Sequence, residues 1–434
     1  MTWQASLLLY TLLLGVAIAL GVPIVAAMSL VGLVGITLLE GTRLWPSLGD
    51  IVWNTVNSFA LTAIPLFVLM GEIILRSGAS SRFYQGVSVL LSRLPGKLAQ
   101  ANIFACALFS AISGSSTATA LTIGTVALPE MRRRGYADAL TLGTLTGGGA
   151  LGNLIPPSIF LLVYAALVQE SVIDLFVATI IPGAIAVAMF MVYVAWRALR
   201  DPSLVPPRTR RHTGRECLVA LWQCVPVTGL IGCIIGGMYF GVVTPTEAAG
   251  FGCLVALILA VVYRELTWQA FQTSLTTSIA ISSVVILIIV AGQILNYAVV
   301  QSGIAKQLAE ALVNLQLAPL AFFTLLFMLY LLLGTFLDGI SMMLLTLPVL
   351  MPSLQAMGFD AVWFGVILVI QSELAQLSPP VGLNLFAVQS IAGDVRLSTI
   401  ALASLPYALM LCALTFLLYF QPELALWLVA TMKG

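Results

Sequence analysis

The sequence predicts an all-α, polytopic membrane protein made of two inverted-topology repeats, each with a re-entrant hairpin and a broken helix. Three observations lead to this prediction. They are the strongly apolar composition, a set of motifs that recurs along the chain, and the uneven distribution of basic residues between the two copies. Composition indicates the fold class, the motifs define the repeats, and the basic residues orient them.

Composition excludes a water-soluble protein. Of the 434 residues, 60% are apolar and 8% are charged, whereas soluble domains carry roughly 25% charged residues. Apolar stretches that can cross a roughly 30 Å hydrocarbon layer recur along nearly the whole chain, as about a dozen crossings or half-crossings. The short alternating segments of a transmembrane barrel are not visible. The net charge of +1 gives no indication of nucleic-acid binding.

The N-terminus and the cysteines carry no targeting or redox signal. No basic residue precedes the first apolar run, so Met1–Gln4 is expected to lead into a retained helix and not a cleaved signal peptide. The six cysteines form no C-x-x-C pair, which argues against a disulfide framework or a metal site.

A set of motifs recurs at a nearly constant spacing along the chain. In each copy, proline is followed by five residues, then by glycine with an aromatic residue, and later by a double proline. The matched pairs, each separated by 223 positions, are Pro129 and Pro352, Gly135 and Gly358, Pro156 and Pro379, and Pro157 and Pro380. We therefore expect a first repeat over residues 1–195, a basic cytoplasmic linker over 196–216 and a second repeat over 217–434.

Basic residues predict opposite orientations for the two repeats. Short cytoplasmic loops are enriched in Lys and Arg, and segments 76–97 and 132–134 together hold seven of them. The equivalent segments of the second repeat keep only Lys306. The N-terminus is accordingly expected on the periplasmic side, with Arg133 and Met357 on opposite faces. Matched sequence with opposite charge bias is typical of transporters with inverted repeats.

The same charge pattern predicts the hairpins. The apolar stretch over about 98–131 lies between two basic segments on one side, so it must enter the membrane and turn back. Its turn falls at Ser113-Gly114-Ser115-Ser116, polar residues tolerated at membrane depth only against protein or a water-filled cavity. The second hairpin, over about 320–354, turns near Gly334, Thr335 and Asp338, and Asp338 takes the position of Ser115.

A broken helix is expected after each hairpin. The first, over about 139–168, breaks at Gly147-Gly148-Gly149 and Gly152-Asn153, before Pro156-Pro157. The second, over about 361–390, breaks at Ser378-Pro379-Pro380, Gly382 and Asn384. Gly and Pro release carbonyls from the helical ladder, and the freed carbonyls suit an alkali cation while helix N-termini attract anions. Glycines also permit close helix packing, but matched tips and breaks together favour a binding site.

Four acidic residues lie in apolar surroundings. A carboxylate at membrane depth is costly and is by default a functional candidate. Asp338 is the strongest candidate, as a sodium ligand or a proton carrier at a hairpin tip. Helix capping explains Glu247 equally well because it follows Thr244 and Pro245. Glu72 is expected near an interface, and Glu373, about a turn before the second break, receives no role from the sequence.

Enzyme motifs are not found. His212 is the only histidine and lies in the basic linker, which argues against an intramembrane Ser-His protease. Neither G-x-S-x-G, H-E-x-x-H nor a Walker A pattern is present. An intramembrane aspartyl protease would need a second aspartate at membrane depth. We therefore expect neither catalysis nor ATP hydrolysis by this chain.

The motifs together resemble the large membrane subunit of tripartite ATP-independent periplasmic (TRAP) transporters, over essentially the full chain. They are Ser113-Gly114-Ser115-Ser116, Pro129-Glu130-Met131, Leu151-Gly152-Asn153-Leu154-Ile155-Pro156-Pro157-Ser158, Thr244-Pro245-Thr246-Glu247-Ala248-Ala249 and Pro379-Pro380-Val381-Gly382-Leu383-Asn384. The resemblance implies sodium-coupled import of an organic acid across the bacterial inner membrane. It also implies an elevator-type architecture, in which a domain holding both hairpins and both broken helices slides against a scaffold.

The resemblance further implies partners and ion sites. A small membrane subunit, expected as a separate chain because residue 1 leads directly into the first repeat, would join this one. A periplasmic substrate-binding protein would deliver the carboxylate substrate. Ser113–Ser116 with Gly147–Gly149 would line one sodium site, and Gly334–Asp338 with Ser378–Asn384 the other. The ligands expected for the co-transported sodium ions are Ser115, Ser116, Gly148, Asp338 and Ser378, and no organic cofactor is expected.

Two other functions stay open at this level. A stand-alone sodium/dicarboxylate symporter of the wider ion-transporter group would share the hairpins and inverted repeats but would need no binding protein. An intramembrane enzyme is disfavoured by the missing motifs. The substrate is open among dicarboxylates, keto acids, sugar acids and sialic acids.

Overall fold

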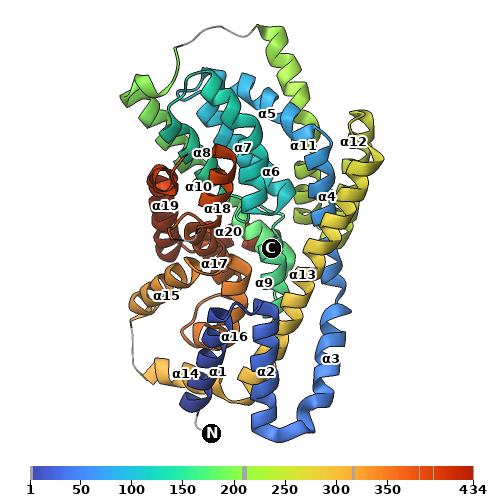
Figure 1. The fold of residues 1–434 in the computed structure, drawn as a ribbon, viewed down its shortest axis with the longest axis vertical. Coiled ribbons are helices and arrows are strands. Elements are labelled where there is room, and N and C mark those ends of the chain that lie inside the picture. The colour runs from blue at the N-terminus through green and yellow to red at the C-terminus, as the bar shows by residue number, and fades with distance from the viewer. Residues whose placement is uncertain (1–2, 208–212, 315–317, 381, 394, 434) are drawn as a thin grey trace.

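The computed structural model describes residues 3–207, 213–314, 318–380, 382–393 and 395–433. Over these residues the regular elements are all helices, and no strand occurs (Figure 1). The all-α membrane fold predicted from composition is confirmed.

Ten α-helices form the first half of the chain. They are α1 (Trp3–Ala19), α2 (Ile24–Glu40), α3 (Trp45–Val56), α4 (Ala63–Arg76), α5 (Ala79–Leu90), α6 (Leu98–Ser113), α7 (Ser116–Arg133), α8 (Asp138–Gly149), α9 (Ile159–Val168) and α10 (Val172–Arg200).

Ten more helices form the second half. They are α11 (Gly214–Tyr239), α12 (Pro245–Val262), α13 (Trp268–Gln301), α14 (Ile304–Asn314), α15 (Pro319–Gly334), α16 (Gly339–Ala356), α17 (Ala361–Gln376), α18 (Leu383–Ala392), α19 (Leu397–Phe420) and α20 (Glu423–Lys433).

The order of helices in the first half recurs in the second. Helices α6 to α10 correspond to α15 to α19, and the second arms of the hairpins, α7 and α16, each have 18 residues. The double prolines Pro156-Pro157 and Pro379-Pro380 each contain a cis peptide bond, and Gly135 and Gly358 have φ of 80° and 81°. In Figure 1 the α6–α7 hairpin lies in the upper half of the molecule and the α15–α16 hairpin in the lower half, as inverted repeats require.

The apolar runs of the sequence form both long helices and shorter ones. Among the described residues six are long and apolar enough, namely α10, α11, α12, α13, α16 and α19, and the pair Ala63–Arg76 and Ala79–Arg93, bent by 70°, would make a seventh. Most arms of the hairpins and broken helices have 10–17 residues. They are short because each ends at a tip or at a break.

Long helices from both halves pack together as a frame. The 34-residue helix α13 lies along α2 and α4, while α12 packs against α4 and α11 against α5. The hairpins and broken helices form a second assembly, which we call the hairpin core, in which α18 packs on α7 and α17 on α10. Helix α17 also contacts α9, and α18 contacts α8, so the two broken helices contact each other.

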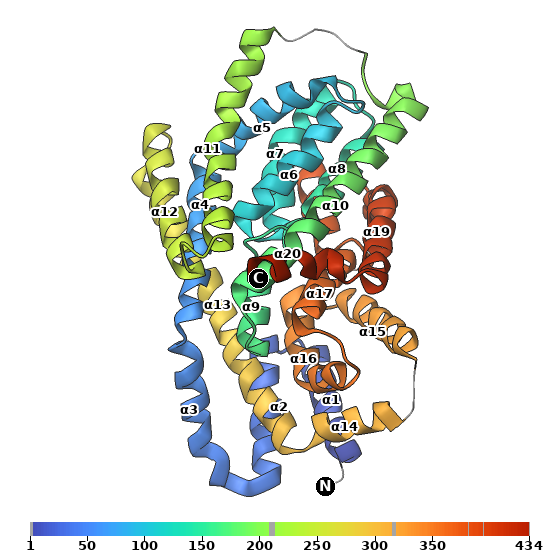
Figure 2. The same ribbon diagram turned by 180° about the vertical axis from the view of Figure 1, so that it is seen from behind.

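The C-terminal helix closes one side of the hairpin core. Figure 2 shows α20 lying across α10 and α17, which it contacts. Its Lys433 Nζ lies 2.5 Å from Oδ2 of Asp174, a nearly buried carboxylate at the start of α10.

The predicted linker is helical at both ends. Helix α10 runs to Arg200, a 3-10 turn covers Pro202–Leu204, and α11 begins at Gly214. Residues 208–212, which include His212, lie outside the described residues. The boundaries of the repeats at 195 and 217 stay a prediction.

Candidate functional site

The tip of the first hairpin is held by its own polar side chains. Gly114, with φ of 57°, ends α6 in the left-handed conformation that glycine adopts without steric cost. Ser115 caps α7, because its Oγ accepts from the backbone N of Ala118 at 3.5 Å. The Oγ of Ser113 lies 2.6 Å from Thr119 Oγ1. The predicted polar turn is therefore a helix C-cap joined directly to a helix N-cap.

The tip of the second hairpin has a carboxylate in the capping position. Asp338 Oδ2 accepts from the backbone N of Ser341 at 3.2 Å, and Oδ1 accepts from the Ser341 hydroxyl. A capping carboxylate is further stabilised by the positive end of the helix dipole. Thr335 donates to Leu332 O of its own helix at 2.7 Å. A Cβ on Gly334 would overlap Ala375, so this glycine permits contact between α15 and α17.

The first break begins later than the sequence indicates. Gly147, Gly148 and Gly149 are all part of α8, which ends at Gly149. A Cβ on these glycines would lie 2.5 Å from the Tyr407 ring, 2.9 Å from Cys106 and 2.7 Å from Ala120, respectively. They therefore permit close packing of α8, and the break starts at Ala150. The assignment of Gly148 as a sodium ligand stays a prediction.

The first break packs directly on the first hairpin tip. A Cβ on Gly152 would overlap Cα of Ser116, so the backbones of the break and the tip touch. Pro156 and Pro157 are buried, while Asn153 is half-buried and faces the tip region.

The second break is built differently. Pro379 and Pro380 are exposed, and Ser378 donates from Oγ to Leu374 O of its own helix at 2.9 Å. A Cβ on Gly382 would lie 2.6 Å from Gln376 O, which makes this a close backbone approach. Val381 lies outside the described residues. The breaks match in sequence, but only the first has its double proline in the interior.

A carboxylate that the sequence left without a role connects the two repeats. Glu373, on α17, has no exposed surface. Its Oε1 accepts from Ser116 Oγ at 2.5 Å and from the backbone N of Asn153 at 3.0 Å. Its Oε2 is buried without a hydrogen-bond partner among the described residues. The signal available in the sequence was an acidic residue in an apolar stretch one turn before a break.

Other polar side chains near the second break also lack partners. The side-chain polar atoms of Gln371, Ser372 and Asn384 are buried and form no hydrogen bond with the described residues. A Cβ on Gly339 would overlap Ser372 Oγ, so this hydroxyl lies against the second hairpin tip. Buried polar groups are normally hydrogen-bonded, so these unsatisfied atoms make the second break a candidate binding region.

A cavity of about 230 Å³ lies between the hairpin tips and the frame. The tips contribute Ser113, Gly114, Ser115, Ser116 and Asp338, and the breaks contribute Asn153 and Gln376. Helices α4 and α13 form the opposite wall with Val68, Gly71, Glu72, Leu75, Ile281 and Val285. The cavity has room for a small organic acid, and it brings together both predicted tips. The predicted residues that do not line it are Gly147–Gly149, Gly152, Pro156, Pro157, Gly334, Thr335, Ser378–Pro380, Gly382 and Asn384.

The donor atoms around the cavity are those of hydroxyls, carbonyls and isolated carboxylates. Among the described residues, no group of three or more His, Cys, Asp or Glu side chains could hold a metal ion. Zinc sites need such groups. Hydroxyls, carbonyls and single carboxylates remain, and these are hard oxygen ligands.

Of the other two acidic residues singled out in the sequence, one is explained by local structure. Glu247 Oε2 accepts from the backbone N of Thr244 at 2.8 Å, and Thr244 Oγ1 accepts from the N of Glu247 at 3.4 Å. This capping box begins α12 and accounts for Glu247 without a transport role. Glu72 lines the cavity.

Comparison with known proteins gives the family. The family described as "Tripartite ATP-independent periplasmic transporter, DctM component" matches residues 11–424. The C4-dicarboxylate TRAP transporter large permease protein DctM of Rhodobacter capsulatus is 31% identical over 390 residues, 86% of this chain and 88% of the relative. The sialic acid TRAP transporter large permease protein SiaM of Vibrio cholerae is 31% identical over 380 residues, 87% of this chain and 88% of the relative.

A solved structure shares the fold. The crystal structure of the Alcanivorax borkumensis YdaH transporter, described as having an unusual topology, superposes with a TM-score of 0.60 at 14% identity and covers 90% of each chain. The relatives compared by sequence are named as transporter permeases and not as enzymes. The chain therefore belongs to the DctM component family of tripartite ATP-independent periplasmic transporters, as a large permease subunit.

Proposed function

We propose that this chain imports an organic acid together with sodium ions across the bacterial inner membrane. In this proposal it works with a small membrane subunit and a periplasmic substrate-binding protein. The observation that carries the proposal is the cavity lined by both hairpin tips. Two of its lining residues, Ser116 and Asn153, donate to Glu373, whose second oxygen has no hydrogen-bond partner among the described residues. Relatives named for C4-dicarboxylates and for sialic acid support a carboxylate substrate.

Sodium gives a physical reason for anion binding at this depth. A carboxylate substrate is costly to bring into the membrane interior, and the cavity lining already carries Glu72 and Asp338. Sodium held by tip hydroxyls and break carbonyls offsets this negative charge, together with the N-termini of α7 and α16. Substrate affinity then depends on sodium occupancy, and the dependence is reciprocal.

The division of the fold supports an elevator movement. The cavity lies between the hairpin core on one side and the frame helices α4 and α13 on the other. A slide of the hairpin core against the frame would carry the tips, the breaks and their ligands together. In this proposal the N-terminus is periplasmic and the 196–216 linker is cytoplasmic.

Uptake by reconstituted protein tests the proposal. The chain is placed in proteoliposomes with its small subunit and binding protein, and uptake of succinate and of N-acetylneuraminate is measured with a sodium gradient. Uptake of one of these acids is expected, with a loss of at least tenfold when potassium replaces sodium. Equal uptake in potassium would refute sodium coupling. Uptake without the binding protein would instead support a stand-alone symporter.

A further inference from the structure

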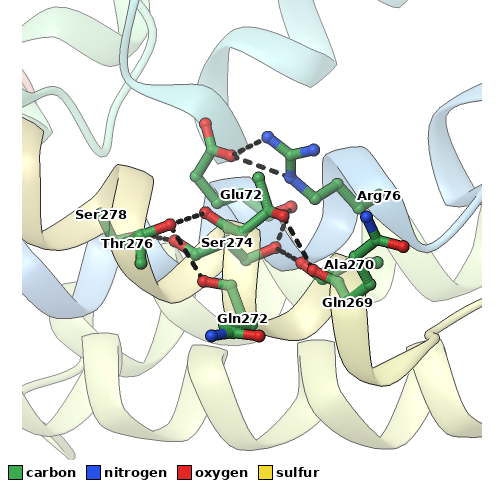
Figure 3. Close-up of polar contacts among 9 residues, drawn as sticks. Glu72, Arg76, Gln269, Ala270, Gln272, Ser274, Thr276 and Ser278 are labelled. Atoms are coloured by element: carbon green, nitrogen blue, oxygen red, sulfur yellow. Dashed lines mark hydrogen bonds and ion pairs between the residues drawn. The ribbon is translucent and has the colours of Figure 1, made fainter.

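The wall that α4 contributes to the cavity carries an ion pair, Glu72 with Arg76 (Figure 3). Arg76 donates from Nε and Nη2 to Glu72 Oε2, at 3.3 and 3.2 Å. Both bonds reach the same oxygen, and in Figure 3 the other carboxylate oxygen points away from the guanidinium. Glu72 lines the cavity, whereas Arg76 does not. The acid therefore borders the cavity, and the base lies behind it.

The backbone of Glu72 is held by neighbours on two sides. From α13, Ser274 Oγ lies 3.3 Å from Glu72 O and 3.0 Å from Ala270 O, and it donates to one or the other (Figure 3). On the other side, a Cβ on Gly71 would lie 2.9 Å from Ile112 O, so α4 touches α6 next to the first hairpin tip. These contacts hold the α4 backbone at Gly71 and Glu72 against α6 and α13.

The residues that line the cavity carry negative charge, and Arg76 compensates part of it. Among the described residues that line the cavity, the charged ones are Glu72 and Asp338, and none is Lys or Arg. Asp338 is offset by the N-terminus of α16, which it caps. Glu72 lies in the interior of α4, so its compensation comes from Arg76, one helical turn later. The side chains are only 15% and 33% exposed, so water screens the pair less than at an open surface.

We propose that Arg76 is a specificity-determining residue that makes the cavity permissive for anions by neutralising Glu72. The proposal rests on the function proposed above, since it concerns entry of an organic acid. Without Arg76, an uncompensated carboxylate would face the incoming anion and repel it. With both charges removed, the wall would be neutral again. Arg76 thus changes the electrostatic potential in the cavity by neutralising Glu72, and it does so without contacting the substrate itself.

A charge-selective thiol probe measures this potential without any substrate. Ile281 lines the cavity from α13 and is 39% exposed, so Ile281→Cys is labelled in the full-length protein. The probes are the anionic sulfonatoethyl and the cationic trimethylammonioethyl methanethiosulfonates. Mass spectrometry of the peptide that contains residue 281 gives the two rates, so the native cysteines do not contribute. Cys217, near the start of α11 and outside the lining, is the internal control.

The ratio of anionic to cationic labelling rates is the readout. Arg76→Gln is expected to lower this ratio roughly three- to tenfold, because it leaves one uncompensated unit charge in the cavity wall. Arg76→Lys keeps the charge and should keep the ratio. The double variant Glu72→Gln/Arg76→Gln should return to the ratio of the unaltered pair. The ratio at Cys217 should be the same in every variant.

Two results would overturn the proposal. One is an unchanged ratio in Arg76→Gln, which would reduce the pair to a helix-stabilising contact. The other is no labelling of residue 281 in any variant, because the pair can act on an anion only if ions reach the cavity. If the ratio shifts as expected but no acid is imported by the wild-type protein, the proposed function fails and the electrostatic role of Arg76 stands.

Discussion

The side chain of Ser116 donates a hydrogen bond to Glu373 at 2.5 Å, although the two residues are 257 positions apart. Ser116 begins α7 at the first hairpin tip, and Glu373 lies in the last turn of α17, next to the second break. The tip of one repeat is thereby joined to the broken helix of the other through one buried carboxylate. The N-terminus of α7 places partial positive charge beside this carboxylate and offsets its negative charge.

Two substitutions of Glu373 distinguish the role of its hydrogen bonds from the role of its charge. Glu373→Ala leaves Ser116 Oγ and Asn153 N without their acceptor and leaves a void, at a cost of roughly 2–4 kcal/mol. Glu373→Gln keeps an acceptor oxygen and should unfold within a few degrees of wild type, but sodium-dependent uptake should fall at least tenfold. Thermal unfolding in detergent and proteoliposome uptake are the measurements. Glu310→Gln, at an exposed position on α14, is the matched control. Equal unfolding temperatures for Glu373→Ala and the wild-type protein would contradict the structural role of the Glu373 hydrogen bonds.

Two substitutions of Asp338 likewise distinguish its role as a helix cap from the role of its charge. Asparagine is as good an N-cap as aspartate, so Asp338→Asn should keep α16 stable, whereas Asp338→Ala should lose about 1 kcal/mol. If the carboxylate holds a cation, both variants lose uptake. Uptake and thermal unfolding of the two variants are compared side by side. Full uptake by Asp338→Asn would limit this residue to a capping role.

Gly152 should tolerate no side chain. A Cβ there would overlap backbone Cα of Ser116, which cannot move as a flexible side chain could. Gly152→Ala is therefore expected to displace the first hairpin tip and to lower stability by roughly 2–3 kcal/mol. Gly229→Ala, in α11, has open space around its Cβ and should be neutral or slightly stabilising. The measurement is the unfolding temperature of each variant. Similar values for the two variants would be inconsistent with the close contact between Gly152 and Ser116 at the first hairpin tip.

Glu247 should matter for stability and not for transport. Glu247→Ala removes one half of the capping box at the start of α12 and should cost about 1 kcal/mol or less. Glu247→Gln keeps the box and should behave as wild type. Uptake is expected to be unchanged in both variants. A tenfold loss of uptake in Glu247→Gln would show that the charge has a further role.

The orientation of the repeats can be tested by labelling single positions. Arg133→Cys and Met357→Cys lie at the ends of the equivalent helices α7 and α16. In spheroplasts, a membrane-impermeant maleimide should modify residue 357 directly and residue 133 only after permeabilisation, as read from the two peptides by mass spectrometry. Labelling of both positions before permeabilisation would contradict the inverted topology.

Much of the fold could be predicted because its signals are local in the sequence. Polar residues within an apolar stretch are intolerable against lipid, so Ser113–Ser116 and Asp338 had to mark turns within protein. The recurrence of Pro156-Pro157 as Pro379-Pro380 related the two halves before any contact was known. Helices α7 and α16 accordingly begin just after the predicted tips.

The extent of the first break could not be predicted, because glycine serves two purposes. Gly147, Gly148 and Gly149 are compatible with a broken helix or with a tightly packed one. The neighbours Tyr407, Cys106 and Ala120, which occupy the space of the missing Cβ atoms, decide for packing. All three neighbours lie 29 or more positions away from their glycine in the chain, so no local pattern indicates them.

By itself, the sequence determined that this protein is a membrane protein of two inverted repeats, because apolar length, motif spacing and charge bias are properties of the chain alone. Only the tertiary structure decided which carboxylates face the site. Glu373 joins Ser116, Glu247 caps a helix, and Glu72 borders the cavity with Arg76 behind it. The physical reason is that the surroundings of a carboxylate depend on how the repeats pack, and residues 257 positions apart become neighbours only then.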